Sequence, residues 1–143
     1  MKTTLGVLAG LVAWTVLVTV AGVALRALWP DYAAVADSMA FTLPMLGTRL
    51  AVSAVTLLAA ARLTTLIAPR ATLATLILGA ILVVAFVPIH ISIWYRFPVW
   101  YHLTFLLTLI PLTVLGGRLA HGAARRGSSS VAAAGRAGAR AGS

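Results

Sequence analysis

Residues 5–25, LGVLAGLVAWTVLVTVAGVAL, form an uncharged apolar run of 21 residues that decides the fold class. A helix of about 20 residues crosses the hydrocarbon core of a bilayer, so this run has the length of a transmembrane helix. Lys2 precedes the run, and a secretory signal peptide also begins with a basic residue followed by an apolar segment. The apolar segment of a signal peptide is usually only about 7–15 residues long, so this run is too long for one. We therefore expect an uncleaved membrane span.

The composition of the whole chain agrees with this first run. Of its 143 residues, 62% are hydrophobic and 9% are charged. Soluble domains contain about 25% charged residues, so most of this chain must have lipid as its solvent. The length corresponds to one domain with room for roughly four or five spans.

Several kinds of chemistry lack the residues that they need. The chain has no cysteine, which excludes thiolate nucleophiles, disulfide exchange and iron–sulfur clusters. Its only two acids are Asp31 and Asp37, and both lie outside the long apolar runs, whereas proton-coupled exporters carry a carboxylate inside the membrane. We therefore expect no enzymatic activity, no catalytic residue, no metal site and no tightly bound cofactor.

Three further apolar segments predict an all-α protein with four transmembrane helices, at about 5–29, 47–67, 70–95 and 99–119. The second span is short between charges, and it reaches both membrane surfaces only if Arg49 and Arg62 extend their side chains in opposite directions. Residues 31–46 are too apolar for a solvated loop. They predict a short interfacial helix that is started by Asp31 or Asp37 and broken at Pro44.

A change of composition after His121 divides the chain into two parts. Residues 1–121 form the predicted four-helix transmembrane domain. Residues 122–143 consist mainly of Gly, Ala, Ser and Arg, which bury too little apolar surface to fold, so we expect a disordered basic cytoplasmic tail. The tail has no aromatic residue between its arginines and carries no signal for nucleic-acid binding.

The basic residues predict the orientation in the membrane, because cytoplasmic loops are enriched in Lys and Arg. With the N-terminus in the cytoplasm, three arginines face outward, Arg26, Arg49 and Arg96. The other eight basic residues face inward, namely Lys2, Arg62, Arg70, Arg118, Arg125, Arg126, Arg136 and Arg140. Most aromatic residues then gather at the outer interface. Both termini are therefore expected in the cytoplasm.

Two histidines are placed where they could meet. His90 and His102 lie on the third and fourth spans, at similar depths below the turn that joins them. Paired imidazoles at matched depth can ligate a b-type haem or relay protons. The alternative is that each is a neutral histidine with an ordinary hydrogen bond.

The three outer arginines are the second candidate site. Arg26, Arg49 and Arg96 could join the two histidines and the two acids in an outward polar patch. Such a patch suits an anionic lipid headgroup or an acidic loop of a partner, because guanidinium groups bind phosphate and carboxylate in a bidentate manner. The alternative is that these side chains only reach for the headgroups.

Small residues predict where helices approach closely. Gly6 and Gly10 form a GxxxG motif in the first span, at the same depth as Gly116 and Gly117 in the fourth, and glycine lets helix backbones come into contact. Packing within the chain is favoured over a dimer motif. Trp14 lies in the middle of its span, and a packing contact is the simplest explanation for it.

Three short stretches carry a resemblance. The segments 67–70 (IAPR), 97–102 (FPVWYH) and 115–118 (LGGR) resemble a pattern in small, uncharacterised four-helix inner-membrane proteins of bacteria. The resemblance implies a bacterial inner membrane and four spans. It implies no activity and no catalytic residue.

Three hypotheses about function follow from these patterns. The first is a non-enzymatic accessory or structural subunit, with membrane lipids and other membrane subunits or further copies of itself as partners. The second is a small transporter or an anionic-lipid-binding protein that uses the Arg/His patch. The third is a b-type haem carrier through His90 and His102.

Overall fold

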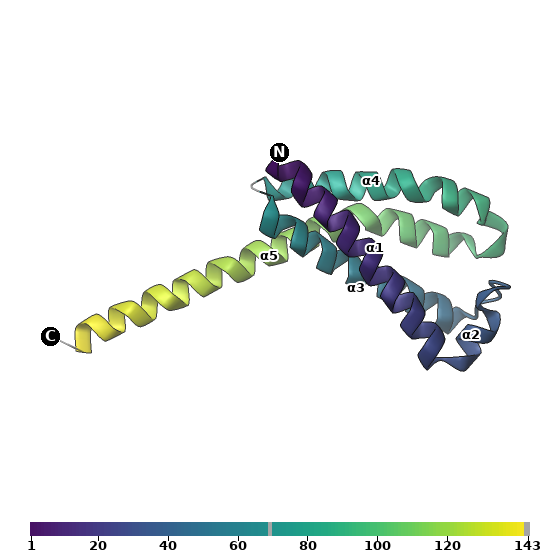
Figure 1. The fold of residues 1–143 in the computed structure, drawn as a ribbon, viewed down its shortest axis with the longest axis horizontal. Coiled ribbons are helices and arrows are strands. Elements are labelled where there is room, and N and C mark those ends of the chain that lie inside the picture. The colour runs from purple at the N-terminus through teal and green to yellow at the C-terminus, as the bar shows by residue number, and fades with distance from the viewer. Residues whose placement is uncertain (69, 142–143) are drawn as a thin grey trace.

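The computed structural model describes the backbone of residues 1–68 and 70–141 and the side chains of residues 1–68 and 70–120. Within these residues every regular element is a helix (Figure 1): α1 (Lys2–Leu28), α2 (Pro30–Ala36), α3 (Leu43–Ile67), α4 (Ala71–Ser92), the 3-10 helix η1 (Trp94–Arg96) and α5 (Val99–Ala141). Helices α1, α3, α4 and the Val99–Ala120 part of α5 are long and apolar enough to cross a membrane. The prediction of an all-α protein with four transmembrane helices is confirmed.

Prolines begin two of the helices. Pro30 is the first residue of α2, and Pro44 lies in the first turn of α3. Proline costs no hydrogen bond there, because the first amide groups of a helix have no acceptor within it. The structure therefore corrects the expected role of Pro44, which starts the second span at Leu43 rather than breaking the short helix before it. That short helix, α2, has Asp31 in its first turn and ends before Asp37.

The last two spans differ from the predicted ranges at their ends. Helix α4 ends at Ser92, and η1 occupies the rest of the segment that was expected to be helical to residue 95. Helix α5 continues to Ala141, beyond the expected end at 119, in a sequence rich in alanine, the strongest helix former. The side chains of residues 121–143 lie outside the described residues, so the domain boundary and the disordered tail stay predictions.

Helix α3 is central in the bundle. It packs against α1 on one side and α5 on the other, and α4 packs mainly against α5. The largest core cluster joins all four long helices and contains Trp14, Leu57, Ala60, Leu78, Leu82 and Leu109. In Figure 1 the helices lie close together near the N-terminus, while α1 and α3 diverge from α4 and α5 toward the end that carries α2 and η1.

Glycines bring the helices into contact at the N-terminal end of the bundle, which we call the glycine end after Gly6, Gly10, Gly116 and Gly117. A Cβ atom at Gly6 would lie 2.9 Å from that of Ala68, and one at Gly116 would lie 2.9 Å from that of Ala61. Gly6 of α1 and Gly116 of α5 therefore both face α3, which separates the two helices. Gly79 of α4 makes a similar close approach to Ile110 of α5.

Candidate functional site

Arg49 occupies the second turn of α3 and is only partly buried. Its Nη1 donates a hydrogen bond to Tyr32 Oη at 2.6 Å, and its Nε donates to Tyr101 Oη at 3.3 Å. The guanidinium carbon lies 4.7 Å from the centre of the Phe41 ring, within reach of a cation–π interaction. The two neighbouring segments before α3, namely α2 and the α2–α3 connection, and the distant helix α5 thus hold one arginine in place.

No carboxylate neutralises Arg49 among the described residues. Asp31 and Asp37 are the only acids of the sequence. Asp37 pairs instead with Arg26, at 3.2 Å, and both of those side chains are largely exposed. A charge that is partly removed from water normally gains a counter-ion, because desolvation is costly. Arg49 therefore retains an unused capacity to bind an anion.

The tyrosines add further donors beside Arg49. Each phenol oxygen accepts a hydrogen bond from the guanidinium, which leaves the phenol hydrogen free to be donated to another group. Tyr32 and Tyr101 are both buried, at 3% and 5% exposure. The site therefore presents several hydrogen-bond donors in one place. Such a donor set matches the oxygens of a phosphate or a carboxylate.

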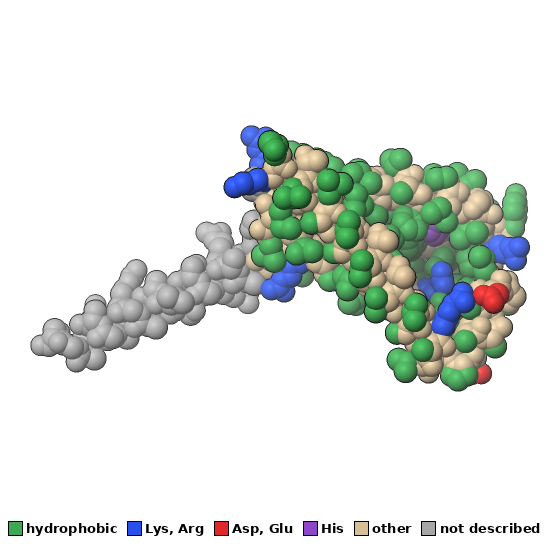
Figure 2. Space-filling model, in the orientation of Figure 1, with side chains coloured by type: hydrophobic (Ala, Val, Ile, Leu, Met, Phe, Trp, Pro, Cys, Tyr) green, Lys and Arg blue, Asp and Glu red, His purple; other side chains and the backbone are tan. Residues whose placement is uncertain are grey.

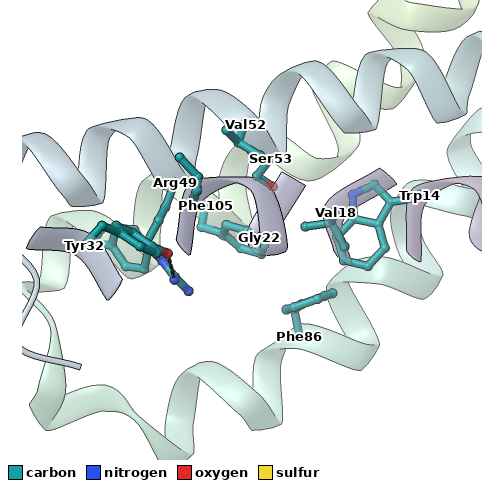
Figure 3. A pocket seen from close by; sticks show the side chains of 11 residues that line it. Trp14, Val18, Gly22, Tyr32, Arg49, Val52, Ser53, Phe86 and Phe105 are labelled. Carbon is teal, nitrogen blue, oxygen red and sulfur yellow. Dashed lines mark hydrogen bonds between the residues drawn. The ribbon is translucent and has the colours of Figure 1, made fainter. Parts of the chain in front are cut away.

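A cavity of about 330 Å³ opens beside this arginine, between the four long helices. Figure 3 shows Arg49 and Tyr32 at one end of the cavity and Trp14 and Phe86 at the other. The walls between them are mainly apolar. A second hollow of about 470 Å³ shares Arg49, Tyr32 and Gly22 with the first, and it is also lined by Arg26. Figure 2 shows a recess on this face in which Lys or Arg and His side chains are visible.

His90 and His102 face each other directly. Their Nδ1 atoms are 2.8 Å apart, so one ring must donate its Nδ1 hydrogen to the other. The pair is buried, at 4% and 0% exposure, among the rings of Phe86, Trp94, Tyr101 and Phe105. Two imidazoles that ligate one iron place it between their nitrogens, and the direct contact leaves no room for it. As arranged here, the pair does not fit a haem.

The expected polar patch is only partly brought together. Arg49 and Arg26 line the same hollow, whereas Arg96 is exposed in η1 and lines neither cavity. Neither histidine lines either cavity, although the ring of His90 is 6.2 Å from that of Tyr101. Among the described residues no group of three His, Asp or Glu side chains could hold a metal.

Sequence reasoning missed the two tyrosines as site residues. It placed most aromatic residues, these two among them, at the outer membrane interface, and that position does not reveal which of them contact an arginine. It explained Trp14 by packing. Trp14 does make an edge-on contact with Phe86, with ring centres 5.2 Å apart, but it also lines the cavity.

These features define a multi-pass helical membrane protein with a partly buried, uncompensated arginine beside a cavity. The chain matches no protein-family model, no curated protein and no solved structure.

Proposed function

We propose that the protein binds an anionic membrane lipid, without catalysing a reaction, and that Arg49 holds the phosphate of the headgroup. The observation that carries this proposal is the position of Arg49: a cation without a carboxylate partner in the described chain, at the wall of a cavity of about 330 Å³. An anion in the cavity would supply the missing counter-charge.

The surroundings of Arg49 support a lipid rather than a small soluble anion. Val18, Phe86 and Phe105 line the same cavity, and such side chains favour hydrocarbon over water. A phospholipid carries its phosphate and its hydrocarbon chains in one molecule, whereas a small soluble anion has no hydrocarbon to place against these walls. Its phosphate would meet the guanidinium and the two phenol groups, while the adjoining part of the lipid would lie against the apolar wall.

We further propose a bacterial inner membrane with both termini in the cytoplasm. Four basic residues lie at helix ends near the glycine end, namely Lys2, Arg62, Arg70 and Arg118. Both acids lie at the opposite end, Asp31 within α2 and Asp37 directly after it, and in Figure 2 the visible acidic side chains gather at that end alone. The positive-inside rule then directs the Arg49 cavity toward the outer leaflet. Because the chain has no cysteine, single variants can report the topology. Ser38→Cys should react with an impermeant maleimide in intact cells, and Thr4→Cys only after permeabilisation; the reverse pattern would invert the proposed orientation.

The accessory-subunit hypothesis receives less support. Gly6, Gly10, Gly116 and Gly117 contact α3 or α4 of the same chain, so these four glycines serve packing within the chain rather than contact with a partner helix. The exposed apolar side chains of the spans are those that lipid would cover. A haem carrier is disfavoured by the direct contact of the two histidines.

The test is lipid retention by the full-length protein in mild detergent, measured by native mass spectrometry. The probes are dioleoyl phosphatidic acid, dioleoyl phosphatidylcholine and inorganic phosphate. We expect retention of phosphatidic acid in preference to the other two, and a loss of about tenfold or more in Arg49→Gln, because hydrogen bonds to charged groups are worth about 1.5–3 kcal/mol.

Arg96→Gln is the matched control, since it removes the same charge from the same end of the molecule, outside the cavity. It should retain phosphatidic acid as the unmodified protein does. Equal retention by Arg49→Gln, or no retention by the unmodified protein, would overturn the proposed function.

A further inference from the structure

Trp14, another residue that lines the cavity, carries a buried hydrogen-bond donor without a partner in the described part of the chain. Trp14 is 7% exposed, and its Nε1 has no hydrogen-bond partner among the described residues. Leaving a buried donor unpaired costs about 1–3 kcal/mol, so an unpaired donor in a folded protein requires an explanation. Trp14 lines the same cavity as Arg49. A hydrogen-bond acceptor on a ligand in the cavity would give the indole nitrogen of Trp14 the partner that it lacks.

Ser53 offers another donor near Trp14. Three buried threonines of α3, Thr56, Thr64 and Thr65, donate their hydroxyls to carbonyls three or four residues earlier. The described contacts include no such bond from the Ser53 hydroxyl. Ser53 lines the cavity, and in Figure 3 its oxygen and the indole nitrogen of Trp14 lie on the sides of their side chains that are turned toward each other.

The spacing relates this polar spot to the arginine. Arg49 and Ser53 are four residues apart on α3, so they lie on one face of the helix, about 6 Å apart along its axis. Ser53 is the residue farther from the start of α3. A ligand with its anion at Arg49 therefore meets Ser53 about one helical turn deeper in the bundle, and Trp14 lies beyond Ser53 toward the other end of the cavity.

We infer that the bound lipid is an ester-linked glycerophospholipid whose ester carbonyl accepts hydrogen bonds from Trp14 Nε1 and Ser53 Oγ. This inference rests on the proposed function. In a glycerophospholipid the glycerol backbone places ester carbonyls a short distance below the phosphate. Polyprenyl phosphates, alkyl phosphates and fatty acids carry only hydrocarbon at that depth, so they would leave both donors unpaired.

The size of the cavity agrees with this assignment. At about 330 Å³ it lies at the small end of the range of about 300–1,000 Å³ for ligand pockets. It suits the phosphate, the glycerol and an ester group. The acyl chains continue outside, along the apolar surfaces of the helices.

The test compares dioleoyl phosphatidic acid with its dialkyl ether analogue, which keeps the phosphate and the chains but lacks the carbonyls. We expect the full-length protein to bind the ester lipid about three- to tenfold more tightly, as one or two neutral hydrogen bonds predict. Trp14→Phe combined with Ser53→Ala should abolish this preference, so that the double variant binds the ester lipid and the ether lipid with equal affinity.

The outcomes separate the two proposals. Equal affinity of the unmodified protein for both lipids, with binding still sensitive to Arg49→Gln, overturns the carbonyl contact and leaves the proposed function standing. An ester preference that survives in the double variant overturns the assignment to Trp14 and Ser53. Failure of the unmodified protein to bind either lipid overturns the proposed function itself. The comparison of the two lipids needs no variant, so it remains decisive if the double variant does not fold.

Discussion

The two ends of the helix bundle are built in different ways. At the glycine end, helices approach until backbone and small side chains touch, as Gly116 does against Leu58 and Ala61. At the opposite end, which we call the aromatic end, Arg49, Tyr32 and Tyr101 join the helices around a cavity. Close packing at one end thus allows the other end to remain open without loss of the fold.

The largest expected effect is on the glycine end. Gly116→Ala would place a Cβ atom 2.9 Å from both Ala61 Cβ and the Leu58 carbonyl oxygen, and a backbone atom cannot move aside cheaply. We expect a loss of about 1–3 kcal/mol in the free energy of unfolding. The measurement is the midpoint of unfolding in mixed micelles with increasing SDS.

Gly47→Ala provides the control for this substitution. No heavy atom lies within 4 Å of the position that its Cβ would take, and alanine is the better helix former. Its stability should stay the same or increase. If Gly116→Ala and Gly47→Ala lowered the free energy of unfolding by similar amounts, close helix packing at the glycine end would not be the cause of the loss.

The histidine pair tests whether buried polar contacts also stabilise the aromatic end. His102→Leu leaves the Nδ1 of His90 without its partner, which should cost about 1–3 kcal/mol. Adding His90→Phe removes the unpaired group, so the double variant should lose less stability than the sum of the single losses. The four proteins form a double-mutant cycle in the same SDS titration, and strict additivity would contradict the mutual hydrogen bond.

Filling the cavity should separate binding from stability. Gly22 lines both hollows, and no heavy atom lies within 4 Å of a Cβ placed there. Gly22→Leu should therefore reduce retention of phosphatidic acid about tenfold, by occupying the space of the ligand, while unfolding remains close to that of the unmodified protein. Gly47→Leu is the matched control. Undiminished retention in Gly22→Leu would argue that the lipid binds elsewhere.

The smallest expected effect comes from a single hydroxyl group. Tyr32→Phe removes one donor from Arg49's surroundings and keeps the ring stacked on Phe41, with ring centres 4.9 Å apart. Affinity for phosphatidic acid should fall about two- to tenfold, as one hydrogen bond predicts. Tyr95 is fully exposed, so Tyr95→Phe should have no effect. If Tyr32→Phe and Tyr95→Phe bound phosphatidic acid with equal affinity, Tyr32 would not be part of the binding site.

The sequence predicted the spans because their signal is local. The length of an uncharged apolar run can be read directly from the sequence, and the prolines and arginines beside it indicate where the helix ends. It predicted the glycines as packing residues but not their partner, because the rotation of one helix against another depends on all the side chains between them. In the same way it placed His90 and His102 at one depth and left open whether their rings meet.

The candidate site was less accessible to sequence reasoning. Arg49 was noticed because a charge interrupts an apolar run. Tyr32 and Tyr101 were not linked to it, since they lie 17 and 52 residues away in the sequence, and only the folded bundle brings them to the arginine. Trp14 had an adequate explanation in packing, and its unpaired nitrogen appears only when hydrogen bonds are assigned in three dimensions.

The two tyrosines also differ in when they become available during synthesis. Tyr32 precedes Arg49 by 17 residues, so it has left the ribosome before α3 enters the membrane, whereas Tyr101 follows 52 residues later. The arginine can therefore enter the bilayer with one hydroxyl partner from its own short preceding helix. The second partner arrives with α5, which also brings the glycines that pack against α3. Completion of the site and closure of the bundle thus depend on the same late helix.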